Sequence, residues 1–466
     1  MRIHVRVRGA PVRGHRIRRG PSVSLLALPV LGIALACGEL TNLEQDNPSQ
    51  ILARDAYQPR NAGLLVNGAI SDFECAFFRY TAAAALLGDE LVNAFANTAN
   101  DNYDRRSHPL TGAYAGGCGA HQQPGVYTSL SVARASADTV VARLEEWTDA
   151  ELPTALNRQQ LIGQAAAYAG YSLILLGEGM CAAAINVGPE LAPADLFRQA
   201  RLRFDRAIIA ATAVNDQTTL NFALIGRART LLNLAYSPPS TPSAPDLAVL
   251  ADAASDAAAV PATFAGVSAL ANVSGTNRQQ NTVFAHTGDT TRGVGSPNYS
   301  SVDPTFANLT FASVPDPRVR VVNTGTLGSD NRTIIRFQTK YANLGSPAPI
   351  ARRTEARLIL AEANALGVAG TPQDAVNIIN ALHQAAGIPN YDPAAPGALP
   401  VLDQVREERR RELFLESHRL GDMHRYNLPL IPAVGAQYPR GGTYSDQRCF
   451  PLPAVERNNN PNIPDV

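Results

Sequence analysis

The sequence has little of what marks the common catalytic and nucleotide-binding classes. Lys340 is its only lysine and Trp147 its only tryptophan. No G-x-G-x-x-G or P-loop motif is present, so nothing points to a nucleotide cofactor. The cysteines do not form the close pairs of a zinc site. The spacing of His383, His418 and His424 matches no metal-ligand pattern, and we expect these histidines to be hydrogen-bonded or exposed. We predict no metal and no cofactor.

Basic residues are not in excess. Lys and Arg number 40 and Asp and Glu also number 40. Seven of the arginines lie within residues 1–36, which contain no acidic residue, so the remaining chain holds 33 basic against 40 acidic residues. Binding to phosphate backbones needs concentrated Lys and Arg. We therefore predict no nucleic-acid partner.

Long apolar runs are rare, and the one present is near the start. Residues 22–36 read SVSLLALPVLGIALA, about 15 residues against the roughly 20 that span a bilayer. An arginine-rich arm precedes this run, and Ala34-Leu35-Ala36-Cys37 follows the pattern of a bacterial lipobox. We predict a signal peptide over residues 1–36, a lipidated Cys37 and a polar tether over residues 37–52. The alternative is an ordinary signal peptide that leaves Cys37 free to form a disulfide.

Four further cysteines are present, namely Cys75, Cys118, Cys181 and Cys449. An even number in an exported protein favours two disulfides. Three pairings are possible and the sequence does not choose among them; our working hypothesis pairs Cys75 with Cys118 and Cys181 with Cys449.

Apolar residues recur at spacings of three and four along much of the chain, the period of an amphipathic helix. The pattern predicts helices at residues 127–147, 156–176, 194–212, 220–236, 246–258, 354–366, 372–386 and 402–418. Small residues at Ala165, Ala166 and Ala169 would allow a neighbouring helix to approach closely. Consecutive helical pairs that bury their apolar faces by stacking predict a mostly α, tetratricopeptide-like solenoid.

The helical pattern is interrupted. Residues 92–125 have clusters of Asn, Asp, Gly and Tyr and are predicted to be long loops. Residues 259–349 are rich in Asn, Ser, Thr, Gly and Pro and contain short β-like runs at 318–322 and 332–337. We predict one domain over residues 53–466, with helical pairs at about 126–236 and 350–420 and a variable insertion of irregular loops and short β-hairpins at about 259–349.

The C-terminal third carries motifs in a characteristic order. Residues 350–365 read IARRTEARLILAEANA, residues 374–387 read DAVNIINALHQAAG, and residues 408–425 read ERRRELFLESHRLGDMHR. An FPLP tail at 450–453 and an Asn-Pro pair at 460–461 follow. These motifs resemble the SusD/RagB family of nutrient-uptake outer-membrane lipoproteins. The chain departs from the family pattern at Ser417, where a glycine is usual, and at Met423, where a leucine is usual.

The resemblance implies a function. Members of this family are non-catalytic proteins of the outer membrane that cap a TonB-dependent (SusC-like) transporter. They capture an oligosaccharide, or in some members a peptide, and deliver it to the transporter. We accordingly expect a lipid-anchored protein on the extracellular face of the outer membrane that is not an enzyme. A surface glycoside hydrolase and a tetratricopeptide-type protein–protein scaffold are the alternatives.

The motif residues themselves favour a structural charge network. Its predicted members carry opposite charges at helical spacing: Arg353, Glu355, Glu408, Arg409, Glu412, Glu416, Arg419 and Asp422. Glutamates four residues apart suit ion pairs within a helix or with the arginines of residues 350–365. The glycosidase alternative needs two of these glutamates across an open cleft, and the neighbouring arginines argue against it.

Candidate ligand contacts are aromatic residues in the predicted loops, because sugars stack on aromatic rings. We select Tyr103, Tyr114, Tyr299 and Phe306. Trp147 lies at a predicted helix end, where packing is the more natural role. Because few exposed aromatics are evident, the ligand could be a peptide or another small nutrient rather than a long glycan.

Overall fold

The structure is a computed structural model that describes residues 52–288 and 298–464. The chain separates into two units, residues 1–55 and 56–466. Helix α1 (Ala53–Ala56) lies at their boundary, and the other elements lie in the second unit. The predicted signal peptide, Cys37 and all but the last residue of the predicted tether are outside the described residues.

Helices dominate the described part of the second unit, which confirms the predicted mostly α class. The helices before residue 260 are α2 (Ala62–Leu87), α3 (Thr98–Asp104), α4 (Tyr127–Glu146), α5 (Arg158–Gly179), α6 (Pro193–Ala213), α7 (Gln217–Ala235) and α8 (Leu247–Ala259). Those after it are α9 (Thr282–Thr287), α10 (Arg353–Ala365), α11 (Pro372–Ala386), α12 (Val401–Glu412), α13 (Arg419–Arg425) and α14 (Ala454–Asn459). Among the described residues, no helix combines the length and the apolar character needed to cross a bilayer.

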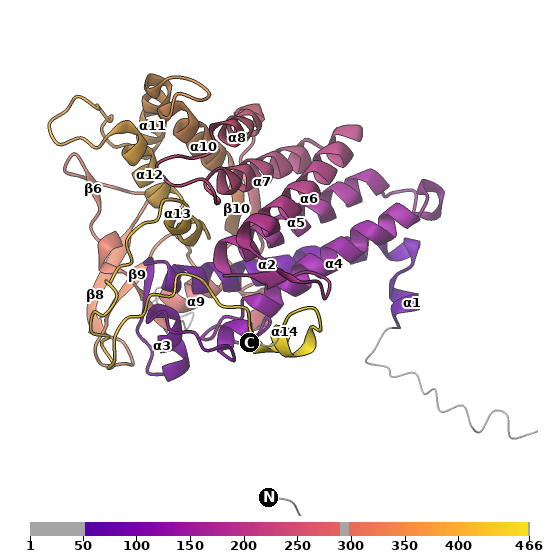
Figure 1. The fold of residues 1–466 in the computed structure, drawn as a ribbon, viewed down its shortest axis with the longest axis horizontal. Helices are drawn as coiled ribbons and strands as arrows, with labels where there is room; N and C mark the ends of the chain where they lie inside the picture. Colours follow the sequence, from indigo (N-terminus) through magenta and orange to yellow (C-terminus); the bar gives the residue numbers. More distant parts are fainter. Residues whose placement is uncertain (1–51, 289–297, 465–466) are drawn as a thin grey trace, which may run out of the picture. The chain divides into compact units, whose positions relative to one another are not determined.

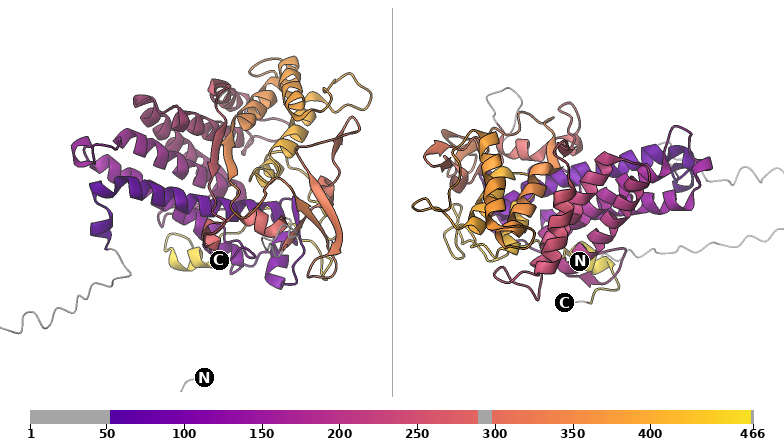
Figure 2. Two further views of the ribbon diagram at one scale, coloured as in Figure 1. Left: turned by 180° about the vertical axis from the view of Figure 1, so that it is seen from behind. Right: turned by 90° about the horizontal axis from the view of Figure 1, so that it is seen from above.

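Consecutive helices pack in chain order, as predicted for stacked helical pairs. Helices α4 to α8, which we call the helical stack, each contact the next one along the chain, and α2 lies against α4 and α5 (Figure 1). Helix α10 packs against α8, so the helices after the insertion continue the same arrangement. Figure 2 shows α10 to α12 and the hairpin of residues 321–338 near one end of the stack.

Local signals in the sequence set the helix ends. The side chain of Asn157 accepts a hydrogen bond from the Gln160 amide at the start of α5, and Asp216 caps α7 in the same way. Thr371 and Asp374 form a reciprocal capping box at the start of α11, which ends at Gly387 in the left-handed conformation (φ 69°). Helix α5 runs three residues beyond its predicted end.

Close approach of helices in the stack depends on small residues. The predicted contact residues Ala165, Ala166 and Ala169 are buried. The ring of Phe204 in α6 lies against two glycines, one on each neighbouring helix: a Cβ atom at Gly170 of α5 would meet the ring at 2.7 Å, and one at Gly226 of α7 would meet it at 2.3 Å. Only glycine leaves room for the ring at these two positions.

The strands form small antiparallel pairs rather than a common sheet. The pairs are β1 (Leu91–Asn93) with β5 (Ser300–Val302), β2 (Ala183–Ala184) with β3 (Glu190–Leu191), β4 (Gly266–Ala269) with β10 (Ala348–Arg352), β6 (Thr310–Phe311) with β7 (Val314–Pro315), and β8 (Val321–Leu327) with β9 (Ile334–Gln338). The predicted β-like runs correspond to the β8–β9 hairpin, displaced by a few residues. The insertion therefore contains the expected short hairpins, together with the short helix α9.

Both disulfides of our working hypothesis are present. Cys75 of α2 is joined to Cys118 in the loop before α4. Cys181, just after α5, is joined to Cys449 in the C-terminal tail. Two backbone hydrogen bonds of 2.9 Å flank the second bridge: the Phe450 amide donates to the Gly179 carbonyl at the end of α5, and the Cys181 amide donates to the Phe450 carbonyl. The disulfide hypothesis is confirmed, and it ties the tail to the helical stack.

The structure corrects the predicted helix over residues 402–418 and the long loop over residues 92–125. Helix α12 stops at Glu412, and a turn with left-handed residues at Leu415 (φ 56°) and Ser417 (φ 69°) separates it from α13. Glu416 therefore does not share a helix with Glu408. The long loop contains α3, which begins at Thr98 and is capped by the side chain of Asn97.

Candidate functional site

Glu408 of α12 is the centre of a buried cluster. Its carboxylate accepts hydrogen bonds from His383 Nε2 (2.9 Å) and Gln404 Nε2 (2.6 Å) and forms an ion pair with Arg318 from the insertion. Burial by itself would raise the pKa of Glu408, but His383 and Arg318 outweigh burial and lower it. Glu408 thus joins α11, α12 and the insertion.

The two other glutamates of the motif bind a shared arginine. Arg352, the last residue of β10, lies 2.9 Å from the Glu416 carboxylate and 3.5 Å from that of Glu412. Lys340 lies 2.5 Å from Glu416. Burial would raise the pKa of Glu416, but Lys340 and Arg352 lower it. The only lysine of the chain is therefore part of this cluster.

The arginines of the motif bind aspartates. Arg409 lies 3.0 Å from the Asp422 carboxylate, which also pairs with Arg425. Arg419 lies 2.8 Å from Asp89, at the end of α2. Burial would raise the pKa of Asp422, but Arg409 and Arg425 hold it well below its usual range. Residues 408–425, which we call the charged segment, thereby contact elements from distant parts of the chain.

Glu355 of α10 belongs to the same network. Its carboxylate lies 3.0 Å from His418 Nε2 and 3.9 Å from Arg229 of α7. Arg229 is in turn paired with Glu178 of α5 at 2.5 Å. The network therefore reaches the interior of the helical stack.

Arg353 does not join this network as predicted. Its Nε atom has no hydrogen-bond partner, and Arg352 makes the contacts to the glutamates instead. Successive residues of an extended chain direct their side chains to opposite sides. Because β10 ends at Arg352 and α10 begins at Arg353, only the first of the two arginines faces the charged segment.

The pKa directions bear on the glycosidase alternative. A glycosidase acid is a carboxyl group whose pKa is raised, so that it stays protonated near neutral pH. The pKa of Glu408 and the pKa of Glu416 are both lowered by the basic side chains around them. These glutamates are suited to fixing the fold and not to donating a proton.

The histidines also have structural contacts. His383 binds Glu408 and the Pro389 carbonyl (2.7 Å), and His424 binds the Arg448 carbonyl (2.8 Å). Within residues 52–288 and 298–464, no group of three or more His, Cys, Asp or Glu side chains is arranged to hold a metal ion.

Three of the four aromatic candidates for ligand contact are buried in the fold. The Tyr103 hydroxyl donates a hydrogen bond to the Pro124 carbonyl (2.8 Å), the Tyr114 ring stacks on Phe450, and the Phe306 ring stacks on Phe414. Tyr103, Tyr114 and Phe306 each expose 1% or less of their surface. This contradicts the prediction for these three residues, because a buried ring offers no face to a ligand. Loop position in the sequence did not mean exposure here, since these loops fold back onto the core.

Tyr299 differs from the other three. Its ring is half-buried and makes edge-to-face contacts with Phe95 (5.1 Å between centroids) and His286 (5.5 Å). Tyr299 stays a candidate, and the structure adds Phe95 as its partner. Trp147 packs in the cluster formed by α2, α4 and α5, as its helix-end position suggested.

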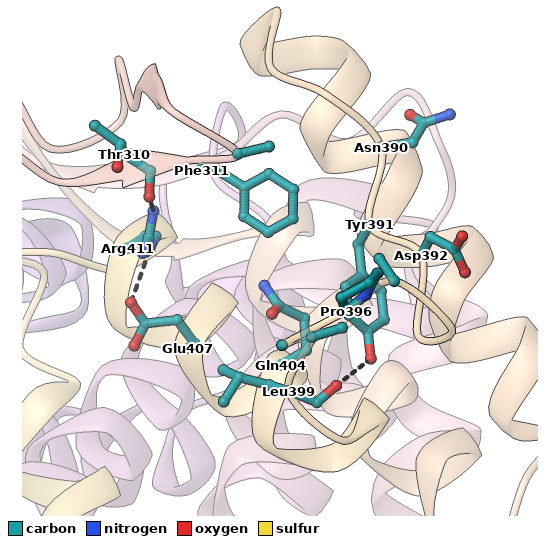
Figure 3. Close-up of a pocket in the computed structure, with 14 residues that line it drawn as sticks. Thr310, Phe311, Asn390, Tyr391, Asp392, Pro396, Leu399, Gln404, Glu407 and Arg411 are labelled. Atoms are coloured by element: carbon teal, nitrogen blue, oxygen red, sulfur yellow. Dashed lines mark hydrogen bonds and ion pairs between the residues drawn. The ribbon is translucent and has the colours of Figure 1, made fainter.

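A pocket of about 410 Å³ lies between the β6–β7 hairpin and the loop that joins α11 to α12 (Figure 3). Its lining comes from these two segments and from α12: Thr310, Phe311, Ala312, Asn390, Tyr391, Asp392, Ala395, Pro396, Gly397, Ala398, Leu399, Gln404, Glu407 and Arg411. The volume is within the range of small-ligand sites.

Phe311 supplies the aromatic surface of this pocket. Its half-buried ring stands between Arg411 and the loop that carries Tyr391 and Asp392 (Figure 3). It contacts His383 edge to face, with centroids 4.4 Å apart. The buried Tyr391 ring is fixed by a hydrogen bond from its hydroxyl to the Leu399 carbonyl (2.6 Å). The pocket thus has a positioned aromatic and apolar surface.

Polar groups of the pocket fall into two sets. Arg411 is engaged: it donates to Glu407 (2.8 Å), to the Thr310 carbonyl (3.0 Å) and to Asp316 (3.0 Å). Exposed groups form the second set. Asn390 is exposed, and Asp392 is exposed with one carboxylate oxygen accepting from the Ala394 amide. An aromatic ring with nearby amide and carboxylate groups is suited to a polyhydroxylated ligand.

The hairpin turn at the pocket edge has a strained backbone. Ala312 (φ 45°) and Ser313 (φ 66°) both occupy the left-handed region between β6 and β7. A two-residue turn with two positive φ values normally uses Asn and Gly. Strain of this kind persists where the surrounding structure holds it and is found at functional sites.

The pocket was not predicted from the sequence. Phe311 stands in the predicted insertion, but no pattern separates it from Phe306, five residues earlier, which is buried. The 390–399 loop, NYDPAAPGAL, indicated only a break between two helices. The hairpin is held beside this loop by Arg411 of α12, which binds the Thr310 carbonyl and Asp316, and by Phe311, which packs on His383 of α11. The sequence alone does not show these contacts.

Comparisons with known proteins agree with this architecture. A sequence model described as the SusD family matches residues 279–463. None of the curated proteins matches the chain. A SusD-like carbohydrate binding protein from Bacteroides vulgatus superposes with a TM-score of 0.62 at 17% identity, covering 87% of this chain and 98% of its own.

Two further solved structures are similar. B. fragilis NanU has a TM-score of 0.62 at 12% identity and covers 90% of this chain and 98% of its own. Surface glycan-binding protein A from Bacteroides thetaiotaomicron has a TM-score of 0.59 at 13% identity and covers 85% of this chain and 97% of its own. The charged segment and the tail lie inside the matched region, and the shared fold extends over the helical stack. The resemblance seen in the motifs is confirmed: residues 279–463 match the SusD family model, and the fold is that of SusD-like proteins.

Proposed function

We propose that this protein is a lipid-anchored, extracellular-facing outer-membrane protein that binds a nutrient oligosaccharide and delivers it to a SusC-like, TonB-dependent transporter. The observation that carries the proposal is the SusD fold, shared over nearly the whole described chain with proteins whose names describe carbohydrate or glycan binding. The lipobox pattern that ends at Cys37 supports the lipid anchor.

The pocket in Figure 3 is the proposed ligand site. A sugar ring would lie on Phe311, and the exposed side chains of Asn390 and Asp392 at the rim of the pocket would supply hydrogen-bonding groups to its hydroxyls. Aromatic stacking and hydrogen bonding together are the usual means of sugar recognition. Tyr299 and Phe95 provide a second, smaller aromatic surface, which is the alternative position for the ligand.

Binding of purified protein to a panel of glycans and peptides, measured by calorimetry, tests this proposal. We expect a glycan to bind and Phe311→Ala to weaken its affinity about tenfold or more, because one stacking contact is lost. Tyr299→Ala is the matched variant. If Tyr299→Ala abolishes binding while Phe311→Ala does not, the ligand lies at the Tyr299–Phe95 surface. If the protein binds peptides and no glycan, its ligand is a peptide and not a sugar.

The anchor and the transporter have their own tests. Cys37→Ala should leave the protein folded and move it from the membrane to the soluble fraction, because the acyl chains would be missing. Purification of the wild-type protein from membranes in mild detergent should recover a β-barrel transporter. Failure to recover a barrel after crosslinking would argue for a scaffold role instead.

We further propose that the protein is not an enzyme. The motif glutamates Glu408 and Glu416 are buried among basic groups, which lower their pKa values. An acid catalyst needs a raised pKa instead. Turnover of any glycan by the purified protein would contradict this.

A further inference from the structure

The charged side chains that line the pocket in Figure 3 do not balance one another. Three charged residues line it, namely Asp392, Glu407 and Arg411. Two are acidic and one is basic, so the lining is net negative. The way in which Arg411 is held decides what charge a ligand meets.

The positive charge of Arg411 is already balanced inside the protein. Its guanidinium binds Glu407 at 2.8 Å and Asp316 at 3.0 Å, and both are carboxylates. Burial would lower the pKa of Arg411, but these two partners raise it, so the three groups form a stable charged set. A ligand carboxylate would have to compete with two fixed carboxylates for this one cation.

Two other arginines of the same ion-pair cluster, Arg410 and Arg318, are committed as well. Arg410 lies 3.2 Å from Glu407 and donates to the Thr305 carbonyl (2.7 Å). Arg318 pairs with Asp316 (2.6 Å), Glu408 and Glu412 (3.2 Å). Neither of these arginines lines the pocket. They cannot supply a free positive charge to a ligand.

The acidic side of the pocket is open. Asp392 is exposed, and only one of its oxygens accepts a hydrogen bond, from the Ala394 amide at 2.9 Å. The other exposed hydrogen-bonding groups of the lining are uncharged, namely the Asn390 amide and the Thr310 hydroxyl. An approaching anion therefore meets an uncompensated negative charge, whereas a neutral hydroxyl can donate to it.

We propose that this pocket selects uncharged sugar units and rejects carboxylated ones such as uronic or sialic acids, because Arg411 is neutralised internally by Glu407 and Asp316 while the exposed Asp392 adds a negative charge at the rim of the pocket. This inference rests on the proposed function, in which the pocket is a sugar site. It names the class of sugar that the site accepts, which the fold alone leaves open.

Matched pairs of probes test the inference. Trisaccharides of galacturonic, glucuronic and mannuronic acid are compared with the neutral trisaccharides made by reducing their carboxyl groups, so that each pair differs only in the charged group. In any pair for which binding is detected, we expect the neutral trisaccharide to bind at least tenfold more tightly than its acidic counterpart at low salt. The ratio should shrink as salt is added, because salt screens an exposed charge.

Two variants identify the cause of the selectivity. Asp392→Asn and Glu407→Gln each remove one negative charge from the lining, and each should lower the neutral-to-acidic affinity ratio about fivefold. Asp252→Asn on α8, an exposed carboxylate that does not line the pocket, should leave the ratio unchanged.

The outcomes separate the two proposals. Equal affinity within a pair, or preference for the acidic member, overturns the charge selection while leaving a sugar site in place. A preference that neither variant changes and that salt does not affect also overturns it, because the cause would be shape. Absence of binding by all six probes, together with binding of peptides alone, overturns the sugar site itself.

Discussion

The helical stack and the charged segment are held together by different physics. In the stack, contacts are made by alanine, glycine and aromatic side chains, as where the Phe204 ring lies against Gly170 and Gly226. In the charged segment, buried ion pairs of arginines with carboxylates are added to apolar contacts such as that of Phe414. Apolar packing requires only volumes that fit, whereas each buried charge requires a partner at a defined position. We therefore expect the two regions to respond differently to substitution.

The largest effect is expected from breaking a buried pair in the charged segment. Asp422→Ala leaves Arg409 and Arg425 buried without this shared carboxylate. The free energy of unfolding should fall by about 3–5 kcal/mol, because an uncompensated buried charge is costly. Urea unfolding measures this change. The control is Asp195→Ala, which removes an exposed pair with Arg198 and should change stability by about 1 kcal/mol or less; equal losses would contradict the comparison.

A buried carboxyl group that contacts the charged segment should also make the free energy of unfolding depend on pH. Glu90 is buried and accepts a hydrogen bond from the Leu415 amide, and burial raises its pKa from 4.5 to about 7. Between these two values the folded protein keeps a proton that the unfolded chain releases. Stability should therefore fall as pH rises from about 4.5 to about 7, by up to about 3 kcal/mol from this group.

Glu90→Gln keeps an acceptor for Leu415 and removes the titration. The variant should match the wild type near pH 4.5 and exceed it above pH 7, which unfolding curves at several pH values would measure. Asp104, whose pKa burial also raises to about 7, should keep part of the slope. Glu190→Gln, at an exposed position in β3, is the control for the Glu-to-Gln exchange itself. An unchanged profile for Glu90→Gln would show that this group does not bind the extra proton.

A glycine-to-alanine substitution should have opposite effects in the helical stack and on α2, which packs against the stack. Gly226→Ala puts a Cβ atom 2.3 Å from the Phe204 ring and should destabilise by about 1–3 kcal/mol. Gly68→Ala on the exposed face of α2 meets nothing within 4 Å and should stabilise by up to about 1 kcal/mol, because alanine favours the helix. Thermal unfolding of both variants measures this. Equal signs would mean that glycine does not govern the approach of α6 and α7.

The smallest effect concerns the turn inside the charged segment. Ser417 occupies the left-handed region (φ 69°), and its buried hydroxyl has no hydrogen-bond partner. Ser417→Gly removes both penalties and should stabilise by about 0.5–1 kcal/mol. Urea unfolding would detect it. Ser417→Ala, which removes the hydroxyl and keeps the strain, separates the two contributions; a loss of stability on Ser417→Gly would contradict the strained turn.

The family's usual glycine at position 417 now has a physical reason. The motif alone suggested one continuous helix through residues 402–418, because its charges repeat every four residues. The chain instead turns after Glu412, and a residue with positive φ is needed at 417. The departure from the family pattern was visible in the sequence, but its consequence depended on a backbone angle.

In the candidate site, too, the sequence showed which residue types are present but not which of them are exposed. The sequence pointed to Tyr103, Tyr114 and Phe306 because they stand in predicted loops, yet all three are buried. It did not point to Phe311, which lines the pocket with residues about 80 positions later in the chain. Local pattern cannot show which loop residues face solvent, because exposure depends on what packs against the loop.

By itself, the sequence determined the mostly α class, the positions of most helices, the resemblance to the SusD/RagB family and the membership of most of the charge network. These features follow from local periodicity, capping residues and motifs, which act over a few residues. The tertiary structure decided which of Arg352 and Arg353 joins the network, where α12 ends, which aromatics are exposed and where the pocket lies. Each of these depends on contacts between segments far apart in the chain, such as the meeting of the β6–β7 hairpin with the α11–α12 loop, and only the packed fold brings such segments together.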